Sequence, residues 1–281
     1  MKKITRRSFL AAAGLSVAAL ALSACGGSSS STASSVASSA AASSEAASSS
    51  AAAAELTTVE AGKLTMATNA AFPPYEMTTD AGAFEGIDID TAQAIADKLG
   101  LELQIDDMDF DAALLSVQQG KADIVMACVT VTDERKNVMD FSDSYATGIQ
   151  SVIVPEGSDI ASPDDLAGKQ IGTQRGTTGY IYCSDDFGDD AVVAYDDGLT
   201  AVQALNNGQV DAVVIDNAPA KEFVAANPGL VILDTNYAEE DYAIGMAKGN
   251  TALEDAVNAA LEELKADGTL QSIVDKYIVA E

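Results

Sequence analysis

The residues with the clearest chemical potential lie between positions 130 and 145. Arg135 stands in a short polar stretch that follows an apolar run typical of a buried strand. It is one of two arginines that remain once the basic N-terminal leader is set aside, in a chain of formal net charge -28. A guanidinium is always charged and can form a bidentate pair with a carboxylate. Two hypotheses follow from these residues alone: Arg135 binds a carboxylate ligand, or it is a surface arginine that pairs with Asp140.

The composition excludes several classes of function. The chain contains no histidine, which rules out a histidine-based catalytic triad and a histidine-ligated metal. Without the four basic residues of the leader, 15 − 4 = 11 basic residues face 43 acidic ones, a balance of -32. Nucleic acids and anionic lipid surfaces require a basic footprint, so neither is an expected partner. We expect no metal, no cofactor and no catalytic residues.

The N-terminal residues 1–25 have the pattern of a signal peptide. A basic start is followed by a short apolar run, residues 10–22, and by Leu22-Ser23-Ala24-Cys25. This ending resembles the bacterial lipobox, in which the cysteine is acylated, so Cys25 is the expected lipidation site. An ordinary secretory signal is the alternative. Residues 5–10 also resemble a twin-arginine signal, which leaves the export route open between Tat and Sec.

Residues 26–55 are almost entirely serine and alanine. Such a segment buries too little apolar surface to offset its conformational entropy, so we expect a disordered tether. About 30 residues would reach roughly 30 Å on average, which is enough to lift a domain clear of a membrane.

The elements that must position Arg135 alternate between strands and helices, which indicates an α/β fold. Apolar positions Ala92, Ile95, Ala96 and Leu99 have helical spacing, and Gly100 ends that helix. Strands are predicted at 63–68, 101–105, 122–129, 151–154, 170–173, 191–195, 212–215 and 242–248. Helices are predicted at 90–99, 111–119, 178–183, 199–207, 219–226, 253–264 and 270–277. The similarity of residues 120–125 to 208–213 favours two related α/β lobes.

Seven short motifs occur in a fixed order along residues 63–278. They lie at residues 67–76, 86–90, 114–123, 130–145, 168–172, 210–216 and 265–269. Together they resemble the extracellular substrate-binding proteins of polar amino-acid ABC transporters. The resemblance implies a two-lobed periplasmic-binding-protein fold of type II with a two-segment hinge. Lobe 1 would comprise residues 56–146 plus 243–281, and lobe 2 residues 147–242.

The same resemblance implies a role and a location. The protein would bind a small L-amino acid in the cleft, close around it and deliver it to an ABC permease. It would be a monomer held by the lipid on Cys25 at the outer face of the cytoplasmic membrane, on the extracellular or periplasmic side.

The resemblance also implies how the ligand's backbone is held. Arg135, Thr130 and the backbone of Ala127 and Cys128 would receive the carboxylate. Gln174 and Thr178 would line the far wall and complete carboxylate binding on closure. Asp216 would pair with the ammonium group. Its alternative role is to cap the helix that follows it, and both roles could hold at once.

Three residues would surround the ligand's side chain. Phe72 and Phe110 would cover it, with core packing as their alternative role. Asn69 stands where several relatives have an aspartate, and its uncharged amide mildly disfavours a basic ligand. If Arg175 pointed inward, an acidic ligand would become plausible. A neutral polar amino acid is therefore favoured, with an acidic one as the alternative.

Two further expectations concern Cys128 and Cys183. Cys128 occupies a position usually held by a smaller residue, so it is expected either to narrow the pocket or to pack as a small hydrophobe. Because the two cysteines fall in different lobes, a disulfide would hinder hinge motion, and we expect free thiols.

Two rival functions remain. A dehydratase-like enzyme on the same fold would need an acid or base in the cleft, for which Glu76 is the one candidate. A sensory ligand-binding domain would need a following membrane span, and the sequence offers none.

Overall fold

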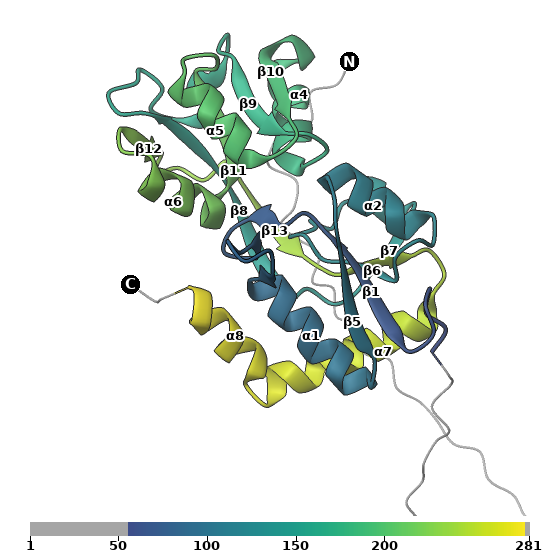
Figure 1. The fold of residues 1–281 in the computed structure, drawn as a ribbon. Helices are drawn as coiled ribbons and strands as arrows, with labels where there is room; N and C mark the ends of the chain where they lie inside the picture. Colours follow the sequence, from purple (N-terminus) through teal and green to yellow (C-terminus); the bar gives the residue numbers. More distant parts are fainter. Residues whose placement is uncertain (1–55, 279–281) are drawn as a thin grey trace, which may run out of the picture. The chain divides into compact units, whose positions relative to one another are not determined.

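The computed structural model describes residues 56–278 (Figure 1). These residues form two lobes, each a β-sheet flanked by helices, so the predicted α/β organisation is confirmed. Cys25, the signal peptide and the serine/alanine segment lie outside the described residues. Within residues 56–278, no helix combines the length and apolar character needed to cross a membrane.

The first lobe contains a five-stranded sheet in the order β5-β1-β6-β14-β7. Strand β1 (Lys63–Thr68) runs parallel to β5 (Glu102–Asp107) and β6 (Ile124–Val125), whereas β14 (Gly245–Ala247) is antiparallel to β6 and β7 (Met139–Phe141). A small second sheet follows β1, formed by β2 (Ala71–Phe72), β3 (Glu76–Thr78) and β4 (Phe84–Glu85). The helices of this lobe are α1 (Ile87–Leu99), α2 (Phe110–Gln118), α3 (Asp133–Lys136), α7 (Thr251–Ala266) and α8 (Thr269–Tyr277).

The second lobe contains a six-stranded sheet in the order β10-β9-β11-β8-β12, with β13 also paired to β8. Its strands are β8 (Ala146–Pro155), β9 (Ile171–Gln174), β10 (Val192–Tyr195), β11 (Ala212–Asp216), β12 (Leu230–Ile232) and β13 (Ala238–Tyr242). Its helices are α4 (Thr178–Phe187), α5 (Gly198–Asn206) and α6 (Asn217–Ala226), with short 3-10 turns at Pro163–Leu166 and Asp189–Ala191.

Strands β8 and β13 connect the two lobes (Figure 1). They pair antiparallel from Ala146 opposite Tyr242 to Gln150 opposite Ala238. We expected one strand over residues 242–248, but the structure divides it: β13 ends at Tyr242 in the second lobe's sheet, and β14 begins at Gly245 in the first lobe's. The chain changes sheets within this segment, which a continuous apolar pattern does not reveal.

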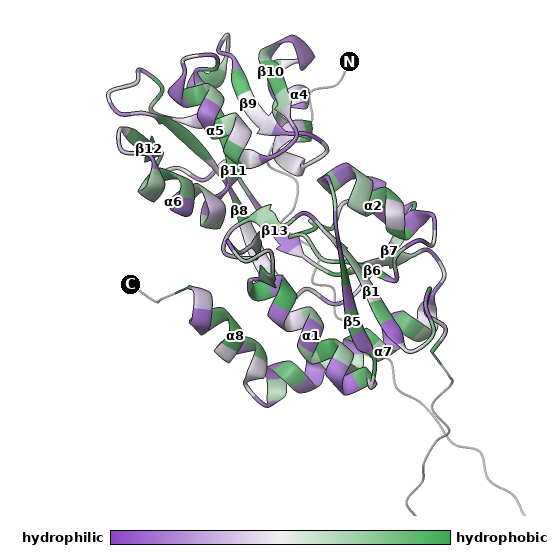
Figure 2. Cartoon of the chain, in the orientation of Figure 1, coloured by the Kyte–Doolittle hydropathy of each residue, from purple (hydrophilic) through white to green (hydrophobic). Residues whose placement is uncertain are grey.

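The core follows the apolar pattern of the sequence. Ala92, Ile95 and Ala96 on α1 are fully buried, as their helical spacing predicts. They pack in one cluster with Leu64 and Ile124 of the central strands. Figure 2 shows hydrophobic residues along the central strands, while the helices also carry hydrophilic faces. Burial of each large aliphatic side chain contributes about 1.5–3 kcal/mol, so this core holds the strand ends in place.

The loop after β6 has a special backbone conformation. Only Ile124 and Val125 of the predicted strand 122–129 remain in the ladder, and Cys128 adopts φ 50. A non-glycine residue in this left-handed region is uncommon and often marks a functional site. The turn places residues 127–130 beside the ends of the strands in both lobes, where the pocket lies.

Candidate functional site

All ten predicted binding residues line one pocket. They are Asn69, Phe72, Phe110, Ala127, Cys128, Thr130, Arg135, Gln174, Thr178 and Asp216. Glu76 and Thr177 complete the lining, and the pocket holds about 310 Å³ of space between atoms, including open solvent at its mouth. The part of this space open to a water-sized molecule is about 10 Å³, so the pocket is nearly closed in this arrangement of the lobes.

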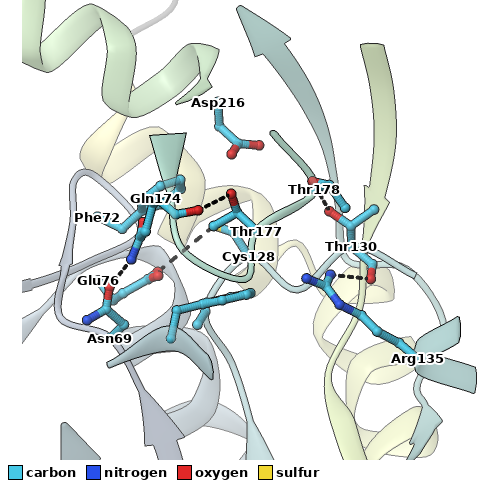
Figure 3. Close-up of a pocket in the computed structure, with 12 residues that line it drawn as sticks. Asn69, Phe72, Glu76, Cys128, Thr130, Arg135, Gln174, Thr177, Thr178 and Asp216 are labelled. Atoms are coloured by element: carbon cyan, nitrogen blue, oxygen red, sulfur yellow. Dashed lines mark hydrogen bonds between the residues drawn. The ribbon is translucent and has the colours of Figure 1, made fainter. Parts of the chain in front are cut away.

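The strand ends explain why residues so far apart in the sequence meet. Asn69 directly follows β1, the loop of residues 127–130 follows β6, Gln174 ends β9 and Asp216 ends β11. In open α/β sheets, ligands bind at the carboxyl ends of strands, and here such ends from both lobes supply the lining. Figure 3 shows these side chains around the pocket.

Arg135 lies on the four-residue helix α3, whose start is capped by the Thr132 side chain. Its guanidinium is buried, with 8% of the residue exposed, and Nη1 donates to the carbonyl of Thr130 at 2.8 Å. Nη2 donates to the carbonyl of Gly176 in the second lobe at 3.1 Å. Burial lowers the pKa of Arg135, because a desolvated cation is disfavoured.

The alternative pairing of Arg135 with Asp140 is wrong. Asp140 forms an ion pair with Lys248 and accepts from the backbone N–H of Gly249. No ion pair of Arg135 with a carboxylate occurs among residues 56–278, although its guanidinium lies 5.4 Å from the centre of the Phe110 ring. A buried guanidinium bonded only to backbone carbonyls is a strong potential partner for an anionic group.

Asp216 brings a buried carboxylate to the same pocket, with 7% of the residue exposed. It also occupies the N-cap position of α6, as the alternative role predicted, but its side chain makes no capping hydrogen bond. Instead the hydroxyl of Tyr242 donates to it. Burial raises the pKa of Asp216 to about 7, which means that a nearby cation would favour its ionised form.

Glu240, on β13, is a buried residue near the pocket that the sequence did not reveal. The hydroxyls of Thr130 and Thr178 both donate to its Oε2, at 3.1 and 3.0 Å, and Gln150 donates to the same oxygen at 3.0 Å. Each hydroxyl has a single proton, so a ligand carboxylate would compete with Glu240 for these donors. The sequence offered no signal for this burial, because Glu240 stands between two other acidic residues and the predicted strand began only at Tyr242.

Glu76, on β3, lines the pocket although it is not one of the ten predicted binding residues. It is 1% exposed, and the thiol of Cys128 donates to its Oε2 at a sulfur–oxygen distance of 3.9 Å. Burial, together with Asp88 and Asp216, raises the pKa of Glu76 well above its usual range. The sequence had suggested it only as the acid or base of a rival enzyme, because the short strand Glu76–Thr78 has no pattern that shows which side faces the pocket.

Asp88 lies next to Glu76 and Cys128 but does not line the pocket itself. It accepts from the backbone N–H of Cys128 at 3.1 Å and from the hydroxyl of Tyr145 at 2.8 Å. Ligand-type atoms of Glu76, Asp88 and Cys128 lie within 4.8 Å of one another, so these residues are the ones that could hold a metal ion. Their hydrogen bonds to each other and to Tyr145 account for the arrangement, and the expectation of no metal stays a prediction.

The two lobes also touch at the side-chain end of the pocket. Gln174 donates through Nε2 to Oδ1 of Asn69 at 2.8 Å, and Asn69 donates to the carbonyl of Met108 at 3.0 Å. The side chain of Arg175, in contrast, is half exposed and forms an ion pair with Asp196, with 3.6 Å between Nη2 and Oδ1. It does not line the pocket, so the argument that an inward Arg175 favours an acidic ligand loses its basis.

Cys128 and Cys183 are both buried and free in the structure. They lie in different lobes, one in the loop after β6 and the other on α4. Burial raises the pKa of Cys128 well above its usual range and that of Cys183 to about 12, so both thiols are protonated at neutral pH.

Comparison with known proteins gives a consistent result. The family model of the bacterial extracellular solute-binding proteins, family 3, matches residues 64–280. The L-cystine-binding protein TcyJ of Escherichia coli is 33% identical over 226 residues, which cover 79% of this chain and 85% of that protein. The L-arginine-binding protein of Pseudomonas aeruginosa is 30% identical over 234 residues, which cover 79% of this chain and 90% of that protein.

Solved structures agree with the sequence comparisons. An ancestral arginine-binding protein bound to arginine has a TM-score of 0.73 at 42% identity, with 77% of this chain and 98% of that chain covered. The arginine-, lysine-, histidine-binding protein ArtJ of Geobacillus stearothermophilus has a TM-score of 0.74 at 33% identity, covering 78% and 96%. The two-lobed fold of periplasmic amino-acid-binding proteins is therefore confirmed. The chain belongs to the bacterial extracellular solute-binding proteins, family 3.

Proposed function

We propose that this protein binds a small L-amino acid outside the cell and delivers it to an ABC transporter permease. The observation that carries the proposal is the pairing of buried opposite charges in one small pocket, Arg135 and Asp216. An L-α-amino acid carries a carboxylate and an ammonium group on the same α-carbon. Arg135 would take the carboxylate through a bidentate pair and Asp216 the ammonium. The relatives are binding proteins for several amino acids, which supports the same role here.

The proposed cycle depends on movement about β8 and β13. Arg135 belongs to the lobe assigned to residues 56–146 plus 243–281, and Asp216 and Thr178 to the lobe assigned to residues 147–242. The ligand would bridge the two lobes and favour their closed arrangement. In the structure a bond from Arg135 to the carbonyl of Gly176 links the lobes, and a bidentate pair with the ligand's carboxylate would replace that bond. The closed protein would then dock on the permease.

We further propose that the protein is a monomer without enzymatic activity or cofactor. It would be held at the outer face of the cytoplasmic membrane by a lipid on Cys25. The lipobox-like sequence before Cys25 and the serine/alanine-rich residues 26–55 support this arrangement, because together they provide an anchor and a spacer. Metabolic labelling with a radioactive fatty acid tests the anchor: the wild-type chain is expected to incorporate label and Cys25→Ser is expected to lose it.

The binding proposal is tested by the ligand that the protein carries. Mass spectrometry of material released on denaturation is expected to identify an L-amino acid, and the refolded protein should rebind it with one-to-one stoichiometry. A micromolar Kd corresponds to about −8 kcal/mol, a net value within reach of two charge-assisted contacts. If the refolded protein has regained its native structure and still binds no amino acid, the proposal is overturned.

A further inference from the structure

A carboxylate of the chain itself lies beside the position proposed for the ligand's carboxylate. Glu240 is 7% exposed, and its Oε2 accepts from the hydroxyls of Thr130 and Thr178, the two threonines expected to receive the ligand's carboxylate. We propose that Glu240 is a built-in competitor of the ligand, which engages these hydroxyls in the ligand-free protein, lowers the affinity for the amino acid and promotes its release. This inference rests on the proposed function and adds a residue that sets the affinity of the same site.

The two threonine hydroxyls cannot serve both carboxylates at once. Each hydroxyl has one proton, and in the structure both hydroxyls donate to Glu240, at 3.1 Å from Thr130 and 3.0 Å from Thr178. The two hydroxyl oxygens lie 3.4 Å apart, and Figure 3 shows both residues next to Arg135. A carboxylate that binds Arg135 at this place must therefore take the hydroxyls from Glu240.

The negative charge of Glu240 also opposes the ligand's carboxylate directly. Among residues 56–278, no lysine or arginine forms an ion pair with Glu240. Burial lowers the pKa of Arg135, and the negative charge of Glu240 counteracts this shift, so Glu240 acts electrostatically on the guanidinium. Two carboxylate oxygens that approach the same hydroxyl lie within about 6 Å of each other, because each is about 3 Å from it. Repulsion at that distance in a partly buried site lowers affinity about 10- to 100-fold.

Glu240 is held less completely than the ligand's carboxylate would be. Its Oε2 accepts from Thr130, Thr178 and Gln150, whereas its Oε1 is buried without a hydrogen-bond partner among the described residues. These three donors are all neutral. The ligand would gain the guanidinium of Arg135, and charge-assisted hydrogen bonds are about twice as strong as neutral ones. The ligand can therefore displace Glu240, which stays beside the site to reverse the exchange.

The place of Glu240 in the fold links this exchange to the lobes. Glu240 lies on β13, one of the two strands that connect the lobes, opposite Gly148 of β8. Its bond to Thr130 reaches the lobe assigned to residues 56–146 plus 243–281, and its bond to Thr178 stays in the lobe assigned to residues 147–242. Loss of this link alone would change the affinity for every ligand by the same factor. Loss of the competition affects only ligands that carry a carboxylate, so the two effects can be separated.

Titration calorimetry of E240Q with the co-purified amino acid and with its carboxamide tests the inference. Glutamine keeps the shape of the side chain, removes the charge and offers an amide donor to the ligand's carboxylate. E240Q is expected to bind the amino acid more tightly than the wild type, mainly through slower dissociation. The ratio of its affinities for the amino acid and the carboxamide should rise about tenfold or more. Glu239→Gln removes the same charge from the exposed neighbour on β13 and should leave this ratio within about twofold of the wild type.

The outcomes distinguish this inference from the proposed function. If E240Q binds the amino acid no more tightly than the wild type, or if both affinities change by the same factor, Glu240 is not a competitor and amino-acid binding still stands. If the wild type binds no amino acid, the proposed function itself is overturned. If E240Q does not fold, a crystal structure of the wild type with its amino acid takes its place. The hydroxyls of Thr130 and Thr178 should then donate to the ligand's carboxylate, and retention of both bonds to Glu240 would contradict the inference.

Discussion

Replacing Arg135 with alanine is expected to weaken ligand binding more than any other single change in the pocket. The guanidinium is buried, and its bond to the carbonyl of Thr130 holds it beside the proposed carboxylate position. Loss of one partner from a buried charge pair costs about 2–5 kcal/mol. At about 1.4 kcal/mol per factor of ten, Kd should rise about 30- to 4000-fold.

The folded state should survive the change from Arg135 to alanine. Two hydrogen bonds to backbone carbonyls are lost, which costs about 1–3 kcal/mol. Burial disfavours the charged form of Arg135 and lowers its pKa. Removing this buried charge therefore offsets part of the cost. Circular dichroism and thermal unfolding of the ligand-free variant should therefore resemble those of the wild type.

Titration calorimetry with the co-purified amino acid measures the binding effect. The matched control is Arg175→Ala, because Arg175 is the other arginine of the described chain and is half exposed beside Asp196. The control should bind within about twofold of the wild type, since exposed ion pairs contribute about 0–1 kcal/mol. Arg135→Lys keeps the positive charge but cannot form a bidentate pair, so its affinity should lie between those of the wild type and Arg135→Ala. A folded Arg135→Ala variant that binds within about threefold of the wild type would refute the reasoning.

Three further predictions follow from the pocket and its surroundings. Because burial raises the pKa of Asp216 from 3.8 to about 7, this carboxyl is protonated in acid and must ionise to hold an ammonium group. Affinity should therefore fall by up to about tenfold per pH unit below about pH 7, and a flat calorimetric profile would contradict the role of Asp216. Gly148→Ala would place a Cβ 2.3 Å from the Tyr242 ring and should lower both stability, by about 1–3 kcal/mol in urea unfolding, and affinity. Gly120→Ala is the control, because Gly120 has φ +64 and open space around it; this change should lower stability by about 1–2 kcal/mol and leave affinity unchanged. Equal affinity of the two variants would contradict the expected effect of Gly148→Ala on binding. Finally, Cys128 and Cys183 should resist iodoacetamide in the native protein and both react after denaturation without reductant, as mass spectrometry would show.

Much of the site could be predicted because strand ends and family motifs carry local signals. Asn69, Gln174 and Asp216 each stand at or just after the end of an apolar strand, and the structure places all three in one pocket. The fold class followed from the alternation of helices and strands, and the buried positions of α1 followed from helical spacing. These signals depend only on nearby residues.

What could not be predicted depends on contacts between distant parts of the chain. Glu240 is buried because β13 pairs with β8, and its partners lie up to 110 residues away in the sequence. Glu76 faces the pocket because β2, β3 and β4 form a small sheet. A strand of three residues is too short for its sequence pattern to predict that sheet. Arg175 turns toward Asp196, which no periodic pattern indicates. Side-chain direction at such positions is set by tertiary packing.

The central claim is that the pocket binds an L-amino acid through its carboxylate and ammonium groups. It is tested most directly by calorimetric titration of the refolded, ligand-free protein with each L-amino acid and with its carboxamide, which lacks the carboxylate. The account predicts saturable one-to-one binding of at least one amino acid and a loss of about 30-fold or more in affinity for its carboxamide. Equal affinity for the two compounds, or no binding of any amino acid, would contradict the account.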